Sequence, residues 1–342
     1  MKPLLSFTDK GIYCNLADVY LDPWKKVKKA VVTHAHADHA KWGMGEYLAH
    51  PHTIAFMRKR IGPIKTQALD YGQPLTINGV KISLHPAGHI PGSAQIRLEY
   101  KGEIWVVSGD YKIDPDPLSL AFEPIPCHNF ITESTFGLPV YQWPDSKQVY
   151  KEINDWWRVN AANNRASLLI GYSLGKSQRL LAGLDDDIGP IYTHGAAENL
   201  NEVYRALKLP LPDTKRVPQS SKKGDFKKAM ILAPPSALGS SWIKRFEPYS
   251  TGLASGWMAL RGTRRRRNVD RGFIMSDHAD WSGLNYAVKE SGAEKVFVTH
   301  GYSDIFSRWL ADLGYDARVV TTESEGELHE IGESKTQEDE GF

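Results

Sequence analysis

Residues 29–39 read KAVVTHAHADH and join a strand signal to a dense group of metal-binding side chains. The first five residues form a short β-branched run, which predicts a buried strand. Directly after it, four side chains that can bind a metal fall within six residues: His34, His36, Asp38 and His39. Imidazole and carboxylate groups suit Zn²⁺, Mn²⁺ or Fe²⁺. Because small alanines separate these residues, the loop can fold around a cation, and its two halves can serve two adjacent ions.

Four further candidate ligands also follow predicted strands. His89, Asp110, His278 and His300 each begin a loop of glycine or other small residues where a β-run stops. In layered α/β folds, functional sites gather at such strand ends. Their shared placement therefore adds all four to the candidate site. His194 has the same placement and stays open, whereas the remaining histidines are predicted to be structural: His50, His52, His85, His128 and His329.

Short strands and helices alternate along the rest of the chain. Strands are predicted over residues 81–85, 95–100 and 103–108, with a hairpin turn at Lys101-Gly102. The later elements are predicted as helix 146–160, strand 167–172, helix 176–184, strand 190–193, a helix through residue 206, and strands 229–233, 272–276, 295–299 and 317–320. This alternation predicts an α/β fold. The loop 138–145, which contains two prolines, is predicted to cross into a second domain.

The composition excludes several classes of protein. With 342 residues, 41% of them hydrophobic and 24% charged, the chain is typical of a soluble globular protein of about two domains. Its two cysteines, Cys14 and Cys127, exclude a disulfide scaffold and a thiolate zinc site. The N-terminus does not resemble a signal peptide, and no run of about 18 apolar residues could span a membrane. We therefore expect a cytoplasmic protein without membrane contact.

Charge is unevenly distributed along the chain, although the net charge is only +2. Residues 213–271 contain fourteen bases and four acids, whereas residues 323–342 contain eight acids and one base. A concentrated basic field indicates a polyanionic partner, and a solvated basic surface is the alternative interpretation. The acidic end is predicted to be a disordered tail.

Taken in order, these motifs resemble a known family of nucleases. The HxHxDH motif at residues 34–39, followed by His89 and Asp110, resembles the metallo-β-lactamase fold. The later motifs of the β-CASP nucleases are similar to TESTFG at 132–137, GYSLGKSQ at 171–178, SDHAD at 276–280 and VTHG at 298–301. The resemblance covers nearly the whole chain up to about Val320. In its length and in the residues of its motifs, the chain most resembles the bacterial ligase-associated DNA exonucleases.

The resemblance implies a fold and a division into domains. The fold would be an α/β metallo-β-lactamase sandwich of the αββα type, with an inserted β-CASP α/β domain. The sandwich would comprise residues 1–137 and 272–322, and the insertion residues 138–271. The acidic tail would comprise residues 323–342.

The resemblance also implies a site with two divalent metal ions, Zn²⁺ or alternatively Mn²⁺. Asp110 would bridge the two ions, and Asp22 would orient the histidine loop. The first ion would be held by His34, His36, His89 and Asp110, and the second by Asp38, His39, Asp110 and His300. A hydroxide bridging the metals would attack the phosphodiester, with Asp38 among the catalytic residues. His278, oriented by Glu133, would protonate the leaving sugar oxygen.

The nucleic acid is expected to bind along the inserted domain. Ser173, Gly175 and Lys176 lie where a strand meets a helix N-terminus, which favours phosphate binding. The alternative interpretation of Lys176 is a surface lysine of the helix. Trp242 and Trp257 are candidates for base stacking, with a place in the core as the alternative. Flanking phosphates are assigned to the basic residues Lys222, Lys223, Arg264, Arg265, Arg266 and Arg267.

Four functions remain in competition. The first is a 5′→3′ DNA exonuclease that acts in DNA repair, with an ATP-dependent DNA ligase and a helicase as partners. The second is a β-CASP ribonuclease, because Glu133 and His300 resemble the RNA-processing branch of the family. The third is a thioesterase like glyoxalase II, which the long basic insertion disfavours. The fourth is an inactive nucleic-acid-binding relative, which the intact set of ligands disfavours.

Overall fold

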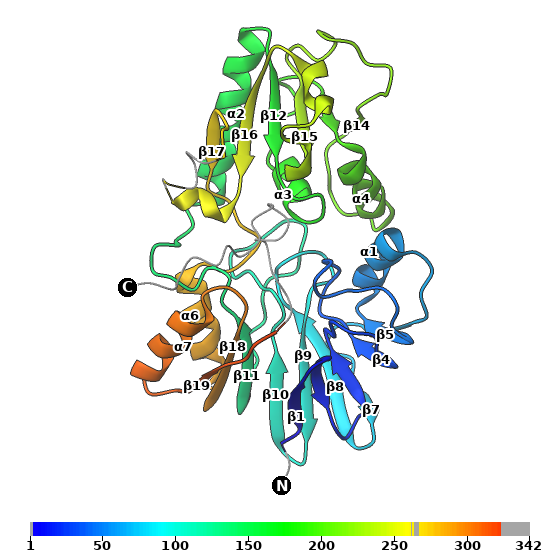
Figure 1. Ribbon diagram of the computed structural model, residues 1–342, viewed down its shortest axis with the longest axis vertical. Coiled ribbons are helices and arrows are strands. Elements are labelled where there is room, and N and C mark those ends of the chain that lie inside the picture. Colours follow the sequence, from blue (N-terminus) through cyan, green and yellow to red (C-terminus); the bar gives the residue numbers. More distant parts are fainter. Residues whose placement is uncertain (1–2, 261, 263–266, 323–342) are drawn as a thin grey trace.

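The computed structural model describes residues 3–260, 262 and 267–322, and it confirms a mixed α/β fold (Figure 1). Two sheets form the lower half of the molecule in Figure 1, and a third sheet stands above them. The predicted acidic tail and three of the predicted phosphate-binding arginines, Arg264, Arg265 and Arg266, lie outside the described residues.

The first sheet has six strands in the order β1-β2-β3-β4-β5-β6. They are antiparallel from β1 to β3 and parallel from β3 to β6. Their bounds are β1 Leu5–Thr8, β2 Gly11–Cys14, β3 Val19–Leu21, β4 Lys29–Val31, β5 Glu46–Ala49 and β6 Thr66–Ala68. The predicted strand before the histidine loop is β4.

The second sheet has seven strands in the order β19-β18-β11-β10-β9-β8-β7. Their bounds are β7 Leu75–Ile77, β8 Val80–Pro86, β9 Ala94–Tyr100, β10 Glu103–Val107, β11 Asn129–Glu133, β18 Lys295–Thr299 and β19 Asp316–Val319. The hairpin predicted at Lys101-Gly102 joins β9 to β10, and both turn residues have positive φ (50° and 86°). This backbone is that of the type I′ turn, whose twist matches the paired strands.

The third sheet is parallel throughout, in the order β14-β13-β15-β12-β16-β17. Its strands are β12 Ala166–Ile170, β13 Ile191–Thr193, β14 Lys215–Arg216, β15 Met230–Ala233, β16 Tyr249–Ala254 and β17 Arg271–Phe273. Every residue of β12 is buried, as expected for a central parallel strand that is covered on both faces.

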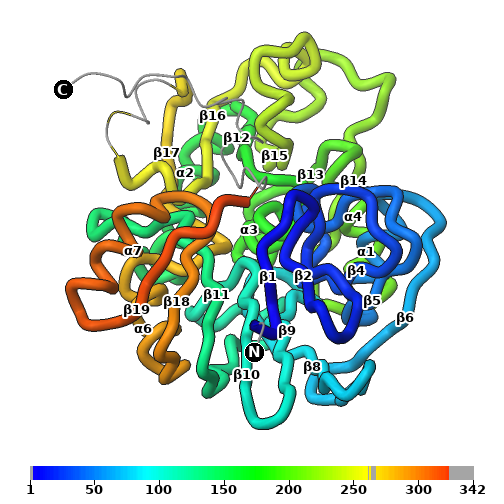
Figure 2. The backbone as a smooth tube through the Cα atoms, turned by 60° about the horizontal axis from the view of Figure 1, so that its bottom comes forward, coloured from blue at the N-terminus to red at the C-terminus, as the bar shows by residue number. Residues whose placement is uncertain are grey.

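Six α-helices and three short 3₁₀ segments lie within the described residues. The helices are α1 Pro51–Ile61, α2 Ser146–Ala162, α3 Lys176–Ala182, α4 Gly195–Ala206, α6 Trp281–Ser291 and α7 Ser303–Asp312, and the 3₁₀ segments are Pro235–Ala237, Ser241–Phe246 and Gly256–Ala259. We call the first two sheets with α1, α6 and α7 the four-layer body. The third sheet with α2, α3 and α4 is the upper unit. Figure 2 shows the two parts from a second direction.

The main core of the four-layer body lies between its two sheets, because alternate side chains of a strand point to opposite faces. Val31 packs in this core, whereas its neighbours Ala30 and Val32 pack on the other face with α1. In the same way Val107 faces the core, and Val106 faces α6 and α7. The layers therefore run helix, sheet, sheet, helix.

Several elements of the structure were not predicted from the sequence. The additions are the strands β1, β5, β6, β7, β14 and β16 and the helices α1, α6 and α7. The boundary predicted at residue 272 falls inside β17, which pairs with β16 through Gly252 and Arg271 and so belongs to the third sheet. Among the described residues, no helix combines the length and the apolar character needed to span a membrane.

Candidate metal centre

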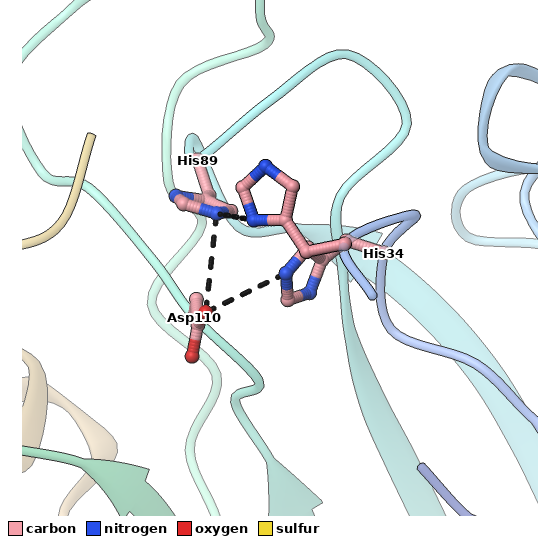
Figure 3. A group of neighbouring side chains, drawn as sticks. His34, His89 and Asp110 are labelled. Atoms are coloured by element: carbon pink, nitrogen blue, oxygen red, sulfur yellow. Dashed lines mark hydrogen bonds and ion pairs between the residues drawn. The ribbon is translucent and has the colours of Figure 1, made fainter. Parts of the chain in front are cut away.

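The predicted ligands converge where strands of the two body sheets end, on the side that faces the upper unit (Figure 1). His34 follows β4, His89 follows β8, Asp110 follows β10 and His300 follows β18. Figure 3 shows His34 and His89 pointing toward Asp110 from separate loops. The placement of these side chains at strand ends therefore does bring them to one point in the fold.

The first group of candidate ligands consists of His34, His36, His89 and Asp110. One ligand atom from each lies within 4.8 Å of the others. The Oδ2 atom of Asp110 is 3.5 Å from Nε2 of His34 and 3.9 Å from Nε2 of His89. The Nδ1 atom of His36 is 3.0 Å from Nε2 of His89. Three imidazoles and one carboxylate thus face a common centre.

The second group shares Asp110 with the first. Asp38, His39 and Asp110 bring ligand atoms within 4.8 Å of one another. The Nε2 atom of His39 is 3.4 Å from Asp110 Oδ2 and 3.5 Å from Asp38 Oδ2. His300, the fourth predicted ligand, is not in this set of three, although its ring stacks on His39 with a centroid distance of 5.5 Å.

Unpartnered nitrogen atoms test whether a cation fits here. The Nε2 atoms of His34, His39 and His300 are all buried and have no hydrogen-bond partner among the described residues. Buried polar atoms are normally satisfied, and a group left without a partner needs an explanation. Two adjacent divalent ions would use these nitrogens together with the carboxylates, so the donor set fits a dinuclear site of Zn²⁺ or a similar ion.

The protonation states also suit metal binding. Burial, followed by repulsion from His39, holds the pKa of His34 well below its usual value. Burial and the neighbouring His278 likewise lower the pKa of His89. Burial opposes charge on His39, but the carboxylates of Asp110, Asp38 and Asp22 prevail and raise the pKa of His39 well above its usual value. A metal that binds His39 would therefore displace a proton.

Asp22 occupies the orienting position that was predicted for it. Its Oδ2 atom lies 2.7 Å from Nδ1 of His39, so the carboxylate accepts the Nδ1 proton. Its Oδ1 atom accepts a hydrogen bond from the backbone N–H of Thr33 at 2.8 Å. Fixing Nδ1–H in this way leaves Nε2 of His39 directed at the candidate metal site, which is how such partners orient metal-binding histidines.

Glu133 and His278 form the predicted pair beside the candidate ligands. The Nδ1 atom of His278 is 2.8 Å from Glu133 Oε2. Glu133 also accepts hydrogen bonds from the backbone N–H of Tyr111 at 2.8 Å and from the hydroxyl of Thr135 at 2.5 Å. A ligand set made of Asp110, Glu133 and His278 is geometrically feasible. Since the carboxylate of Glu133 already accepts three hydrogen bonds, the geometry favours its orienting role.

The three residues predicted to bind phosphate, Ser173, Gly175 and Lys176, lie in different surroundings. Ser173 lines an open cleft of about 420 Å³ that also contains His36, Lys59 and Arg60. Gly175 has a φ of 88°, and a Cβ atom there would lie 2.5 Å from Ile90 Cγ2, so only glycine fits. These two residues bring the upper unit against the candidate metal centre.

For Lys176, both interpretations that the sequence left open, a phosphate-binding lysine and a surface lysine, are wrong. It is neither exposed to a phosphate nor a surface lysine, because its side chain is fully buried. Its Nζ atom is 3.6 Å from Asp277 Oδ2 and donates to the carbonyl of Met275 at 3.3 Å. The sequence pattern of a helix N-terminus could not reveal this, because both partners come from a segment about one hundred residues further along the chain.

Among the described residues, the lysines predicted to bind phosphate are not gathered at the metal centre. Lys222 and Lys223 are exposed, and Lys223 pairs with Glu247 at 2.6 Å, just before the amino end of β16. The candidate ligands face the opposite, carboxyl ends of the third sheet. Arg267 is half-buried, and the three arginines before it lie outside the described residues.

The two tryptophans proposed for base stacking are both in or against the core. Trp257 is buried and packs against Phe136 and Tyr141, with centroid distances of 4.9 and 5.6 Å. Trp242 is half-buried and packs against Phe246 at 4.6 Å. For Trp257 the core interpretation is therefore correct. His194, which the sequence left open, caps α4 by accepting from the backbone N–H of Ala196 at 3.1 Å.

Two residues that touch the site were not predicted from the sequence. Arg60 donates to the backbone carbonyl of Ala35 inside the histidine loop. Arg179 donates to the backbone carbonyl of His89 at 3.0 Å. No local signal points to Arg60, but Arg179 directly follows the GYSLGKSQ motif and could have been included with it.

Comparison with known proteins gives relatives of two kinds, and no family model matches the chain. The chain is 30% identical to a probable DNA ligase of Opitutus terrae over 326 residues, which is 93% of this chain and 31% of that protein. It is 27% identical over 124 residues to the endoribonuclease YSH1 of Eremothecium gossypii, covering 36% of this chain and 16% of that protein. It is also 27% identical over 149 residues to RNase aCSPSF2 of Saccharolobus solfataricus, covering 41% and 29%.

The chain spans less than a third of the length of each of these relatives. A solved structure of a protein of unknown function from Enterococcus faecalis has a TM-score of 0.55 at 9% identity, covering 79% of this chain and 74% of that one. The likeness to this solved structure concerns the fold alone. The named relatives support the β-CASP family of nucleases and, with it, a hydrolase.

Proposed function

We propose that this chain is a metal-dependent phosphodiesterase that degrades DNA as a 5′→3′ exonuclease, built as a metallo-β-lactamase sandwich with an inserted β-CASP domain. The observation that supports it most is the pair of ligand groups that share Asp110. Two adjacent divalent ions, when bound there, supply an activated water and offset the charge of a phosphodiester in the transition state. The residues predicted for the two metals keep those roles in the proposal, including His300.

The chain's own residues would hold the ions and move one proton. His34, His36 and His89 would hold the first ion and His39 the second. Burial lowers the pKa of His34 and of His89 and so keeps their ring nitrogens neutral, whereas His39, with its raised pKa, would release a proton when the ion binds. His278 gives a proton to the leaving sugar oxygen from Nε2, since its Nδ1 is engaged with Glu133 at 2.8 Å. The cleft beside His36 would admit the strand, and on its wall Lys59, which pairs with Glu202 at 2.8 Å, and Arg60 would add positive charge near the phosphates.

DNA is proposed as the substrate because the ligase-named relative matches a larger share of this chain than the named ribonucleases do. The similarity to the protein named as a probable DNA ligase covers 93% of this chain, whereas the named ribonucleases match 36% and 41% of it. The matching region makes up only 31% of that ligase-named protein. We take this as support for a DNA ligase that works beside this chain. The buried free thiols of Cys14 and Cys127 are compatible with the proposed cytoplasmic location.

A time course on one sequence prepared as DNA and as RNA tests this proposal. Each strand carries a 5′-phosphate and an internal label, with Zn²⁺ or Mn²⁺ supplied. The Asp38→Ala/His39→Ala double variant is the negative control, and His85→Ala is the matched control because His85 lies outside the site and pairs with Glu123. Stepwise shortening of DNA from the 5′ end, with RNA intact, is the expected result.

The other outcomes select among the alternatives. Loss of RNA with DNA intact would reject the DNA proposal in favour of a β-CASP ribonuclease, the second candidate, which the named ribonuclease relatives favour. No loss of either strand by a protein that binds two metals would reject nuclease activity. Hydrolysis of a glutathione thioester in that case would identify the thioesterase, and strand binding without hydrolysis would identify an inactive relative.

A further inference from the structure

A buried arginine of the upper unit reaches across to the four-layer body. Arg179 lies on α3 and is only 5% exposed. Its Nη1 atom is 2.6 Å from Asp116 Oδ2, and its Nε atom is 3.0 Å from Asp277 Oδ1. Its Nη2 atom donates to the backbone carbonyl of His89 at 3.0 Å. One guanidinium group therefore contacts two buried carboxylates and a candidate metal ligand.

These contacts fix His89 from two directions. The backbone of His89 is held by Arg179, and its ring Nδ1 lies 2.9 Å from the backbone carbonyl of Asp277, which accepts the proton. The carboxylate of Asp277 is in turn held by Arg179 and by Lys176. Since Nδ1–H is fixed in this way, the Nε2 lone pair of His89 is directed at the centre shared with Asp110.

A second ligand of the same group depends on the same segment of the upper unit. Nε2 of His36 donates to the backbone carbonyl of Leu174 at 3.1 Å, which leaves Nδ1 for the shared centre. Leu174 lies in the turn before α3 and Arg179 lies five residues later, within α3. By contrast, His39 of the second group is oriented by Asp22, which belongs to the body.

We infer that Arg179 is a positioning residue that makes the affinity of the first metal group depend on how the upper unit sits against the body. Arg179 and Leu174 orient His89 and His36, while Asp38 and His39 keep their own support within the body. Docking of the upper unit therefore completes the first group and leaves the second largely unchanged. This inference rests on the metal binding in the proposed function, but it does not depend on which polymer is cut.

Metal binding to the full chain tests the inference without any nuclease assay. Zn²⁺ is titrated into the metal-free protein by calorimetry against a competing chelator, in an Asp38→Ala background so that only the first group stays complete. Removing Arg179 alone would take away the cation that pairs with the buried carboxylate of Asp116, whereas Asp277 would keep Lys176. The test variant is therefore Arg179→Gln with Asp116→Asn, which removes one charge of each sign and leaves Asp277 with Lys176.

The expected result is a 10- to 100-fold lower Zn²⁺ affinity of the first group, the usual effect of losing a residue that orients a ligand. Arg158→Gln is the matched control, because Arg158 also contacts two carboxylates of the upper unit, Asp155 and Asp185, but is half-exposed. That control should bind Zn²⁺ as the parent does. In a His36→Ala background, where the second group stays complete, the test variant should bind Zn²⁺ normally.

Two results would overturn the inference. Unchanged Zn²⁺ affinity of the first group would show that Arg179 does not position its ligands. An equal loss of affinity in both backgrounds would show that Arg179 acts only by holding the fold together. If the double variant does not fold, Arg179→Lys takes its place. A lysine keeps the charge but cannot reach all three partners, so a selective loss of the first group is again required. Failure of the chain to cut nucleic acid would overturn the proposed function and leave this result standing.

Discussion

At the scale of single residues, Asp110 is the group on which the site depends. Its carboxylate faces ligands of both candidate groups, and burial is outweighed by the nearby His39 and His278, which hold the pKa of Asp110 well below its usual value. The buried imidazoles around it compete with one another for protons, and one of them, His39, keeps the charge. The orienting partners Asp22 and Glu133 then decide which ring nitrogen each histidine presents.

The Asp22→Asn variant tests the orienting partner of the second group. An amide cannot accept from both Thr33 and His39 as the carboxylate does, so the His39 ring loses its fixed tautomer. We expect the second metal to bind about 10- to 100-fold more weakly and the first to bind normally. Calorimetric titration with Zn²⁺ measures both steps, and equal loss of both metals would contradict the assigned division.

His278→Gln separates proton transfer from metal binding. The variant keeps both ligand groups, so it should still bind two metal ions per chain. We expect the cleavage rate to fall by about 10²- to 10⁴-fold, the range for losing a general acid. Glu133→Gln should lower the rate in the same direction, because Glu133 fixes His278 at 2.8 Å. A His278 variant that cuts at the full rate would remove this residue from the mechanism.

At the scale of elements, two packed helices begin with a histidine cap. His50 caps α1 by accepting from the backbone N–H of His52 at 3.2 Å, and His194 caps α4 in the same way. Both helices pack with the outer face of the first sheet. A histidine cap is lost when Nδ1 is protonated, so these helix starts are sensitive to pH.

The stability of α1 should therefore fall in mild acid. Burial, with a contribution from His52, lowers the pKa of His50 from 6.5 to about 4. Because the folded pKa is the lower one, the unfolded chain binds more protons between pH 6.5 and 4, and stability is lost as the pH falls through that window. His50→Asn keeps a good cap that does not titrate. The parent protein loses free energy of unfolding between pH 7.5 and 5. We expect His50→Asn to reduce that loss by about 1–2 kcal/mol.

Denaturant unfolding of the metal-free protein at the two pH values measures this difference. His194→Asn is the matched comparison, because His194 caps its helix in the same way but is only half-buried. It should remove less of the pH dependence than His50→Asn does. If the His50 variant loses as much stability in acid as the parent, the histidine cap does not titrate as described.

The same scale shows what the sequence could predict. Strand β4 and its ligand-rich loop were recognisable because the β-branched run and the histidines are adjacent in the chain. The hairpin at Lys101-Gly102 was also correct, since it depends on two neighbouring residues. The helices α1, α6 and α7 and the strands β1, β5, β6, β7, β14 and β16 were missed. Lys176 was misplaced and Arg179 overlooked, because their partner Asp277 is brought to them only by the packing of the upper unit on the body.

At the scale of the whole molecule, the aromatic core of the upper unit extends to the site. Phe136 follows β11 of the body, packs against Trp257 of the upper unit and has His278 at a centroid distance of 6.1 Å. This core thus joins the two parts next to the proposed general acid. Together with Arg179, it makes the placement of the upper unit part of the site's geometry.

Trp257→Ala distinguishes this core role from base stacking. Loss of a buried tryptophan should lower the free energy of unfolding by about 3–5 kcal/mol. At a temperature where the variant stays folded, its affinity for single-stranded DNA should change by less than the several-fold loss expected for a stacking residue. Calorimetric unfolding and fluorescence anisotropy check the two parts. Normal stability with a selective loss of DNA affinity would return Trp257 to the binding surface.

The most direct test of the two-metal account is cleavage measured while metal is returned to the metal-free protein. Zn²⁺ is added in steps to a fixed concentration of protein, with 5′-phosphorylated DNA and RNA strands of one sequence present together. We predict no cleavage without metal, cleavage of DNA that rises until two equivalents per chain are bound, and none by Asp110→Asn at any step. Cleavage by the metal-free protein, or full activity at one equivalent, would contradict the account.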